Sequence, residues 1–255
     1  MAEADHLPGP GGAGVPTAAS NLTVRIVSAL VLAPLAVATT YVGGLPFVLF
    51  WGVAAIAVLW EWTTVVAGPD HRLMVSACGS AIAVAALVTW IGRPVAAILL
   101  IGLGVLASLI FAPRHRRLWV TAGVGYAGVM LMAPAILRGD DPDGFVAIIL
   151  LFAVVWTTDV VGYFAGRTFG GPKLAPLISP KKTWSGAIAG TLGAMVVAVG
   201  AVCFWGGYNR IAIALVALVL SVVAQLGDLM ESRIKRQFGV KDASMLIPGH
   251  GGVMD

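Results

Sequence analysis

The chain has 255 residues, of which 59% are apolar and only 11% carry a charge, whereas soluble globular domains average about 45–50% apolar and about 25% charged residues. The mean hydropathy of +0.94 points the same way. This composition excludes a disordered, collagen-like or disulfide-scaffold protein, and it supplies too little polar surface for a soluble enzyme of this length. The sequence therefore predicts an all-α fold, a polytopic helical bundle integral to a membrane.

The net charge of +4 arises from 16 Lys and Arg against 12 Asp and Glu. Membrane proteins carry additional Lys and Arg in their cytoplasmic loops, so this mild excess does not require a nucleic-acid partner, and we expect none. Cys78 and Cys203 both lie in apolar runs and form no metal-binding spacing. We interpret them as small packing residues.

Residues 1–23 are expected to form a flexible cytoplasmic tail, because most of this segment is rich in Gly, Pro and Ala and it lacks the layout of a signal peptide. From residue 24 onward, apolar stretches long enough to cross a bilayer, which takes about 20 helical residues, alternate with short breaks. We predict one transmembrane domain over 24–255 with about eight spanning helices. These helices are expected at 24–41, 45–67, 73–91, 94–112, 118–137, 145–164, 184–206 and 210–228.

The basic residues predict how this bundle is oriented. With the N-terminus in the cytoplasm, every one of the 16 Lys and Arg falls on the inner side except Arg93, Arg138 and Arg210. This distribution is the one that the positive-inside rule describes. We therefore expect an integral membrane protein whose N-terminus is cytoplasmic.

Three carboxylates, Glu61, Asp159 and Asp228, interrupt the apolar segments. An ionised group at the centre of a spanning helix costs about 2.5–3.5 kcal/mol, so such residues usually face a polar cavity. In the predicted orientation each lies toward the cytoplasmic end of its helix. A polar site at that membrane face is one interpretation, and helix ends that reach the headgroups are the alternative.

Asp228 opens a pattern of charged residues. Asp228, Glu231 and Lys235 are spaced three and four apart, which places them on one face of a continuing helix. Two carboxylates one turn apart suit hard cations, which prefer oxygen ligands. A plain salt bridge at a helix end is the alternative for Glu231 and Lys235.

The residues after this helix extend the pattern. Lys241 is followed by Asp242, and His250 is flanked by glycines in Pro-Gly-His-Gly-Gly. Glycines allow the backbone to approach a ligand closely. Basic side chains beside carboxylates fit a magnesium–nucleotide site, in which the cation neutralises phosphate charge and the basic groups hold the remaining oxygens.

A second polar segment, 166–183, is rich in Gly and Pro, basic, and supplied with hydroxyl groups. That chemistry suits phosphate, as does the helix N-terminus expected near residue 184. An ordinary positive-inside loop would explain its Lys and Arg but not its hydroxyls. By contrast, the G-x-G-x-x-G match at 123–128 lies inside an apolar span without a preceding strand, and we interpret it as helix packing.

The segment 232–255 resembles the signature of the phosphatidate cytidylyltransferase (CDP-diacylglycerol synthase) family at every defined position up to Asp255. The resemblance covers the chain from about residue 24 to its end. Supporting stretches lie at 60–62, 159–167, 174–176, 179–183 and 225–228.

The resemblance implies a magnesium-dependent nucleotidyl transfer, with one or two cations, at the cytoplasmic face of a bacterial inner membrane. CTP and phosphatidate would give CDP-diacylglycerol and pyrophosphate, and residues 24–255 would form the catalytic domain. The family pattern continues past Asp255 with a second Asp and a further spanning helix. We therefore expect this sequence to be truncated at its C-terminus and to lack a ninth helix.

Together, the residue pattern and the resemblance predict three sets of site residues. The predicted catalytic residues are Asp228, Lys235, Lys241, Asp242, His250 and Asp255. The predicted metal ligands are Asp228, Glu231 and Asp255. The predicted substrate-binding residues are Asp159, Arg167, Lys173, Ser179, Lys181, Lys182, Thr183, Arg236, Gly251 and Gly252.

Other functions remain open at this point. A secondary transporter of an anionic solute would use the same polar cluster, but the sequence shows no paired inverted repeats and the cluster lies at one face. A CTP-dependent lipid-alcohol kinase would release CDP in place of pyrophosphate. A non-catalytic scaffold would leave the clustered charges without a reason. The small-residue helix faces also favour a homodimer.

Overall fold

The computed structural model describes residues 18–68, 72–249 and 251–255. Within these residues the chain forms eight helices and one β-hairpin. The helices are α1 (Ala18–Val42), α2 (Gly44–Ala67), α3 (Arg72–Trp90), α4 (Pro94–Phe111), α5 (Arg117–Arg138), α6 (Pro142–Phe169), α7 (Trp184–Trp205) and α8 (Arg210–Gln237). The strands β1 (Lys173–Ala175) and β2 (Ser179–Thr183) lie between α6 and α7.

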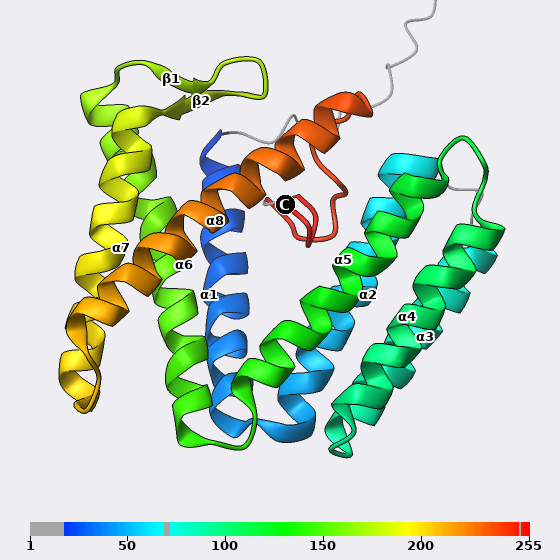
Figure 1. Ribbon diagram of the computed structural model, residues 1–255. Helices are drawn as coiled ribbons and strands as arrows, with labels where there is room; N and C mark the ends of the chain where they lie inside the picture. The colour runs from blue at the N-terminus through cyan, green and yellow to red at the C-terminus, as the bar shows by residue number, and fades with distance from the viewer. Residues whose placement is uncertain (1–17, 69–71, 250) are drawn as a thin grey trace, which may run out of the picture.

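The connections between helices gather at two ends of the bundle (Figure 1). The α1–α2, α3–α4, α5–α6 and α7–α8 turns lie at the lower end in this view, while the α4–α5 turn, the hairpin and residues 238–255 lie at the upper end. We call the upper end the hairpin end, and residues 238–255 the C-terminal segment. The alternation is what a chain that crosses the bundle with each helix requires.

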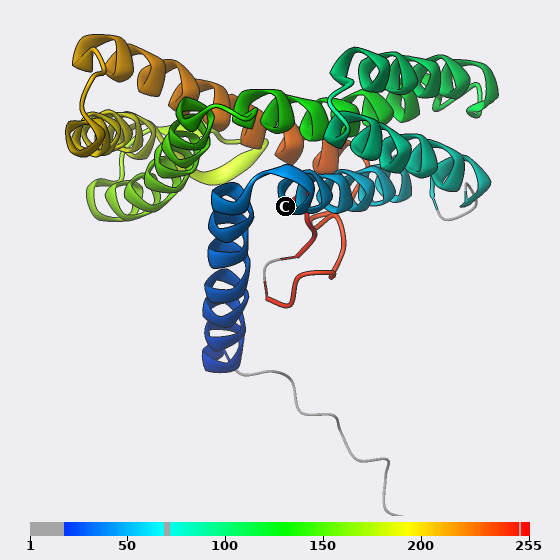
Figure 2. The same cartoon turned by 90° about the horizontal axis from the view of Figure 1, so that it is seen from below.

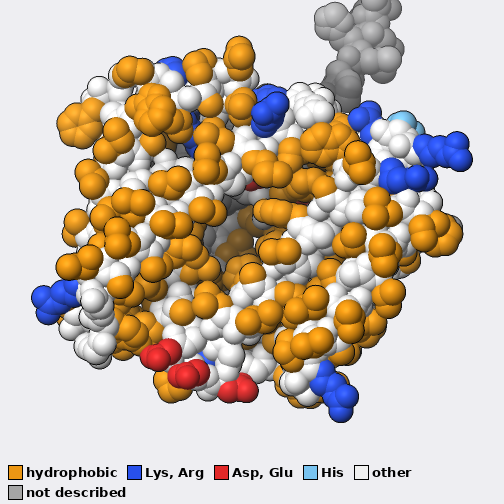
Figure 3. All heavy atoms as spheres, viewed as in Figure 1, with side chains coloured by type: hydrophobic (Ala, Val, Ile, Leu, Met, Phe, Trp, Pro, Cys, Tyr) orange, Lys and Arg blue, Asp and Glu red, His pale blue; other side chains and the backbone are white. Residues whose placement is uncertain are grey.

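The helices pack as two groups. Helices α2, α3, α4 and α5 pack on one another, and α6, α7 and α8 form the second group. Helix α1 contacts α2 and α6 and leans out of the layer that the other helices form, as Figure 2 shows. Between the two groups, the molecular surface has a central hollow with a largely hydrophobic rim (Figure 3).

The eight predicted helices are all present, and their bounds differ by only a few residues in most cases. Six of the eight described helices are long and apolar enough to cross a membrane. In α1 and α3 the apolar part is shorter, at Ile26–Val42 and Met74–Trp90. The chain is an integral membrane protein of the predicted helical type.

Three boundaries differ from the prediction at the polar ends of helices. Helix α6 continues from 164 to Phe169, so Arg167, expected in the second polar segment, is helical. Helix α8 continues from 228 to Gln237, because the charged residues there keep the helical spacing of three and four. Helix α1 begins at Ala18, so residues 18–23, expected to be part of the tail, are helical. The rest of the predicted tail, 1–17, lies outside the described residues.

A short β-hairpin, which the sequence does not predict, is added to the helical bundle that it does predict. Its strands are antiparallel, with Lys173 opposite Thr183 and Ala175 opposite Ser179. Strand β2 leads directly into α7, whose first turn is capped by the Thr183 hydroxyl accepting a bond from the Gly186 amide. The hairpin therefore holds its lysines at a fixed position over the end of α7.

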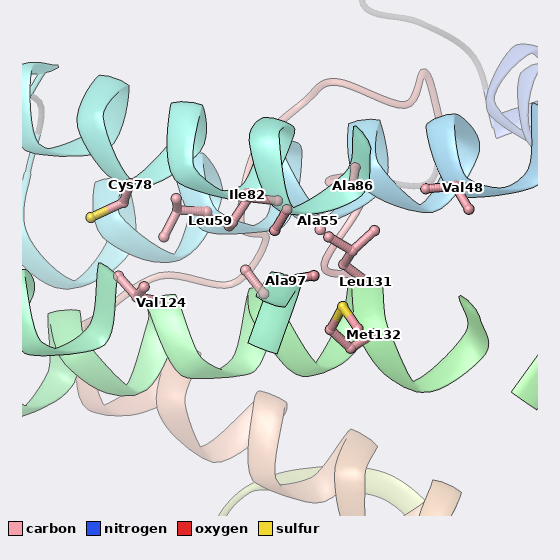
Figure 4. Close-up of a cluster of buried hydrophobic side chains, with 12 residues drawn as sticks. Val48, Ala55, Leu59, Cys78, Ile82, Ala86, Ala97, Val124, Leu131 and Met132 are labelled. Atoms are coloured by element: carbon pink, nitrogen blue, oxygen red, sulfur yellow. The ribbon is translucent and has the colours of Figure 1, made fainter. Parts of the chain in front are cut away.

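Apolar side chains fill the α2–α5 group. A buried cluster of small and branched residues from α2, α3, α4 and α5, including Leu59, Ile82, Ala97, Val124 and Leu131, lies between these helices (Figure 4). The glycines of the G-x-G-x-x-G match belong to this packing, since a Cβ at Gly123 would collide with the Trp62 ring. Its interpretation as a helix-packing motif is confirmed.

Glycines bring α6 and α7 unusually close together. Gly162 and Gly166 on α6 face Gly186 and Gly190 on α7, a small-xxx-small pattern on both helices. A Cβ at Gly186 would lie 2.6 Å from the Gly162 carbonyl oxygen, and one at Gly190 would lie 2.6 Å from the Thr158 carbonyl oxygen. This contact fixes α7, and with it the hairpin, against α6.

Gly190→Ala is therefore expected to destabilise the protein by about 1–3 kcal/mol, because the new methyl group overpacks the α6–α7 contact. Gly200→Ala is the matched control, since a Cβ there meets open space on the same helix, and alanine favours helix by about 1 kcal/mol over glycine. Thermal unfolding of both variants in detergent should show a lower melting temperature for the first only. Equal melting temperatures would contradict the close packing.

Candidate functional site

Polar side chains from distant parts of the chain meet at the hairpin end. Helices α2, α6 and α8 all end there, so the three carboxylates that interrupt apolar sequence, Glu61, Asp159 and Asp228, lie toward the same end. The C-terminal segment folds back beside α8 at this place. The geometry of these groups is described below, one contact at a time.

Asp228 forms an ion pair with Lys182, which joins α8 to β2. The two side chains are 46% and 28% exposed, so the pair is open to solvent on one side. Asp159 on α6 lies within electrostatic range of both. The structure thus brings together three of the residues that the sequence predicts for the site.

Lys235 bridges two further carboxylates. Its Nζ donates to Glu231 Oε1 at 2.8 Å and forms a second ion pair with Asp255. The three side chains are only 18% exposed or less, and a buried charge needs both a partner and hydrogen bonds. The contact between Lys235 and Glu231 follows from their spacing of four along α8. The contact between Lys235 and Asp255 forms because the chain turns back after α8.

Asp255 is held by backbone amides as well as by Lys235. Its Oδ2 accepts hydrogen bonds from the Ala243 amide at 2.8 Å and from the Gly252 amide at 2.7 Å. Burial by itself would raise the pKa of Asp255, but the bonds from Lys235 and the two amides outweigh burial and lower it. Asp255 is therefore a carboxylate at neutral pH.

The glycines around His250 approach carboxylates of their own chain. Gly251 has a φ of +114°, and a Cβ there would lie 2.7 Å from Asp255 Oδ2. A Cβ at Gly252 would lie 2.5 Å from Glu61 Oε1. These contacts explain why glycine is needed at both positions, while their roles toward a substrate remain predictions. His250 itself lies outside the described residues.

Glu61 is the site residue that sequence reasoning did not place. Its side chain is fully buried, and it accepts hydrogen bonds from the Ser244 hydroxyl, from the Val253 amide at 2.8 Å and from the Met254 amide at 2.6 Å. The signal available in the sequence was a carboxylate within an apolar helix. Nothing in the sequence pairs it with residues that follow it so far along the chain.

The remaining predicted residues lie around this network without a described contact to it. Arg167 donates to the Tyr163 hydroxyl at 3.1 Å, and Arg236 donates to the Val240 carbonyl at 3.4 Å. Thr183 caps α7. Within residues 18–68, 72–249 and 251–255, no hydrogen bond or ion pair joins the side chains of Lys173, Ser179, Lys181, Lys241 or Asp242 to the network.

The carboxylates fit a metal ion that takes some of its ligands from the protein and the others from a polyphosphate. Among the described residues, no three His, Cys, Asp or Glu side chains converge closely enough to hold an ion alone. Lys182 balances Asp228, and Lys235 balances Glu231 and Asp255. Mg²⁺ is usually bound by one or two carboxylates together with substrate phosphates and water. The donor set therefore suits magnesium bound together with a nucleotide.

Lys235→Met should lower the melting temperature, because it leaves Glu231 and Asp255 without their cation, a loss of up to about 3–5 kcal/mol for a buried pair. Thermal unfolding in detergent tests this.

The control for that experiment is Lys241→Met, which removes an exposed lysine of the same end of the bundle. It should leave the melting temperature unchanged. If Lys235→Met behaved like this control, the bridge between the two carboxylates would not contribute to stability.

Comparison with known proteins identifies the family. The cytidylyltransferase family model matches residues 23–255. The phosphatidate cytidylyltransferase of Brucella abortus biovar 1 (strain 9-941) is 42% identical over 242 residues, 92% of this chain and 88% of that protein. The phosphatidate cytidylyltransferase of Rickettsia felis (strain ATCC VR-1525 / URRWXCal2) is 35% identical over 191 residues, 64% of this chain and 84% of that protein. With the family match spanning all eight helices and the charged network, this chain belongs to the cytidylyltransferase family.

Proposed function

We propose that this chain is a phosphatidate cytidylyltransferase, which converts CTP and phosphatidate into CDP-diacylglycerol and pyrophosphate. As a member of the cytidylyltransferase family it is a nucleotidyltransferase embedded in a bilayer. Its similarity to the Brucella abortus enzyme extends over 92% of the chain. The observation that carries the proposal is the charged network at the hairpin end, where Lys182, Asp228, Lys235 and Asp255 meet beside the ends of spanning helices.

The reaction requires positioning and charge neutralisation more than acid–base chemistry. An anionic oxygen of phosphatidate attacks the α-phosphorus of CTP, a new P–O bond forms, and the bond to the β-phosphate oxygen breaks as pyrophosphate leaves. Because the attacking oxygen is already an anion, no strong base is needed. The protein must hold two groups of like charge in line, and fixed basic side chains supply that stabilisation.

The basic residues at the hairpin end suit this task. Lys173, Lys181 and Lys182 belong to the hairpin, and Arg236 and Lys241 lie at and after the end of α8. We assign the first set to one substrate phosphate group and the second set to the other. Charge-assisted hydrogen bonds from Lys and Arg to phosphate are the strong kind.

Nucleotidyl transfer usually uses a divalent metal ion. Asp228, Glu231 and Asp255 would hold one or two Mg²⁺ ions here, and the bound metal would neutralise triphosphate charge. Lys182 and Lys235 already pair with these carboxylates. They would then be free to bind phosphate oxygens once the cation takes over their carboxylates.

The lipid substrate accounts for the membrane location. The hollow between the two helix groups has a largely hydrophobic rim, and we propose that acyl chains enter laterally there (Figure 3). Residues 24–255 form the catalytic domain, with the N-terminus and the hairpin end facing the cytoplasm of a bacterial inner membrane. Acidic side chains gather at the opposite end, which suits an outward-facing surface. Small-residue helix faces favour a homodimer.

The purified chain in nanodiscs, supplied with CTP and phosphatidate, should form CDP-diacylglycerol and pyrophosphate in equal amounts with Mg²⁺ and neither product with EDTA. Chromatography of the lipid product and an enzymatic pyrophosphate assay measure both. Release of CDP would indicate a phosphotransferase instead, and uptake of an anionic solute into proteoliposomes without CTP would indicate a transporter. Absence of turnover with magnesium, both in this chain and in the same chain extended to its natural C-terminus, would contradict the proposed function.

Asp228→Asn is expected to reduce turnover by at least about 100-fold, as the loss of a charge-stabilising group at a reacting phosphate does. The amide keeps the size of the side chain but cannot balance a cation. Melting temperature and insertion should stay close to those of the wild type, because the group is 46% exposed. Asp140→Asn, an exposed change at the opposite end, is the control. Near-normal turnover of folded Asp228→Asn would contradict the assignment of Asp228 as a metal ligand.

A further inference from the structure

We propose that Glu61 is a positioning residue: from α2 it holds the C-terminal segment, and thereby sets the place of Asp255 in the site. The inference rests on the proposed function, which gives Asp255 its role at the metal and phosphates. It concerns a residue that lies on the helix group opposite to α8 and touches neither Asp228 nor Lys235 among its described contacts.

The position of Glu61 requires a reason, because it is costly. Glu61 lies in a strongly apolar helix, and its side chain is fully buried. Burying an ionised carboxylate is very unfavourable unless hydrogen bonds replace its hydration. A residue kept for packing alone would be served by Leu or Met at this position. The hydrogen-bond partners of Glu61 therefore indicate what it does.

All of the described donors to Glu61 come from the C-terminal segment. Oε1 accepts from the Ser244 hydroxyl and the Val253 amide, and Oε2 accepts from the Met254 amide. Both oxygens act only as acceptors, which is the pattern of a carboxylate. These bonds close a contact between residues 183 to 193 positions apart in the chain. Glu61 thus binds the segment near both of its ends.

The bonded amides lie immediately before Asp255. Val253 and Met254 donate to Glu61, while the Gly252 amide donates to Asp255 Oδ2 at 2.7 Å. Gly252 is also pressed against Glu61, since a Cβ there would lie 2.5 Å from Oε1 and 2.6 Å from Oε2. The amides of residues 252–254 are therefore held by two carboxylates, those of Glu61 and Asp255. A shift at Glu61 must move the backbone that carries Asp255.

Apolar contacts hold the C-terminal segment to the bundle but cannot set its register. Met254 and Ala243 pack in a buried cluster with Val58 and Trp62 of α2 and Ile234 of α8. Such contacts are non-directional. The directional bonds to Glu61 select one register of the C-terminal segment. Loss of hydrogen bonds that orient a metal-binding residue typically changes metal affinity or activity by about 10- to 100-fold.

The variant that tests this is Glu61→Gln, which keeps the shape and places an amide donor against amide donors. Thr63→Val is the matched control: Thr63 is also buried on α2, and its hydroxyl bonds only to the Leu59 and Trp60 carbonyls of its own helix among the described residues. Both variants are made in the full chain.

The first readout is hydrogen exchange in the metal-free protein, which does not depend on activity. Glu61→Gln should accelerate exchange of the amides at 252–254 by at least about tenfold, as expected when a local contact opens. Exchange in α6 and α7 should stay at the wild-type rate. Thr63→Val should match the wild type throughout the C-terminal segment.

The second readout is kinetic. In Glu61→Gln, kcat should fall about 10- to 100-fold and the Mg²⁺ concentration for half-maximal rate should rise, while KM for phosphatidate stays within about twofold, because the binding of that substrate is not affected. Higher Mg²⁺ should restore part of the lost rate. A purely structural role would lower the amount of folded enzyme without changing this magnesium dependence.

If Glu61→Gln fails to fold, Ser244→Ala takes its place, since it removes one of the three bonds to Glu61, together with the bond that the Ser244 hydroxyl accepts from the Leu246 amide. Ser244→Ala should accelerate hydrogen exchange of the same amides, and it should raise the Mg²⁺ concentration for half-maximal rate, each by a smaller factor than Glu61→Gln. Unchanged exchange at 252–254, or a general loosening of all helices in both variants, would overturn the inference. A wild-type chain that makes no product, even when extended to its natural C-terminus, would refute the proposed function, and the exchange result would still decide whether Glu61 holds the segment.

Discussion

The arrangement of the hairpin end depends on how a membrane protein pairs several carboxylates with cations. Lys235 pairs with the largely buried Glu231 and Asp255, and Lys182 pairs with the more exposed Asp228. The Lys182–Asp228 pair joins β2 to α8, and the Lys235–Asp255 pair joins α8 to the C-terminal segment. The contacts that compensate charge therefore also hold the tertiary structure together. The close α6–α7 packing supports one pair by fixing the hairpin, and the buried cluster around Ile234 supports the other.

The fold could be predicted largely from hydropathy, because spanning helices must satisfy their backbone internally and so appear as long apolar runs. The predicted helix at 210–228 ended early because the charged turns up to Gln237 carry no apolar signal. The hairpin was missed for a different reason. Its strands of three and five residues are too short and too polar for strand periodicity to be detected.

The candidate site could be predicted in composition but only partly in geometry. Spacing along one helix placed Glu231 and Lys235 on the same face, and their ion pair was the alternative to a cation site there. The pairs of Lys182 with Asp228 and of Lys235 with Asp255 depend on how separate elements meet, which no local pattern encodes. Glu61 was the hardest case, because its partners are mostly backbone amides and every residue except proline has one.

The hold of Glu61 on the C-terminal segment also has a consequence for biosynthesis. A ribosome delivers α2 to the bilayer long before residues 244, 253 and 254 exist, since they follow by 183 to 193 positions. During that interval the carboxylate has none of its described donors, and inserting α2 carries the cost of a polar group, which is about 2.5–3.5 kcal/mol at a helix centre and smaller toward a helix end, where Glu61 lies. The rest of α2 is apolar enough to offset that cost. Helix α2 thus enters the membrane before the donors of Glu61 are translated, and their hydrogen bonds to its carboxylate form only once residues 244, 253 and 254 have followed.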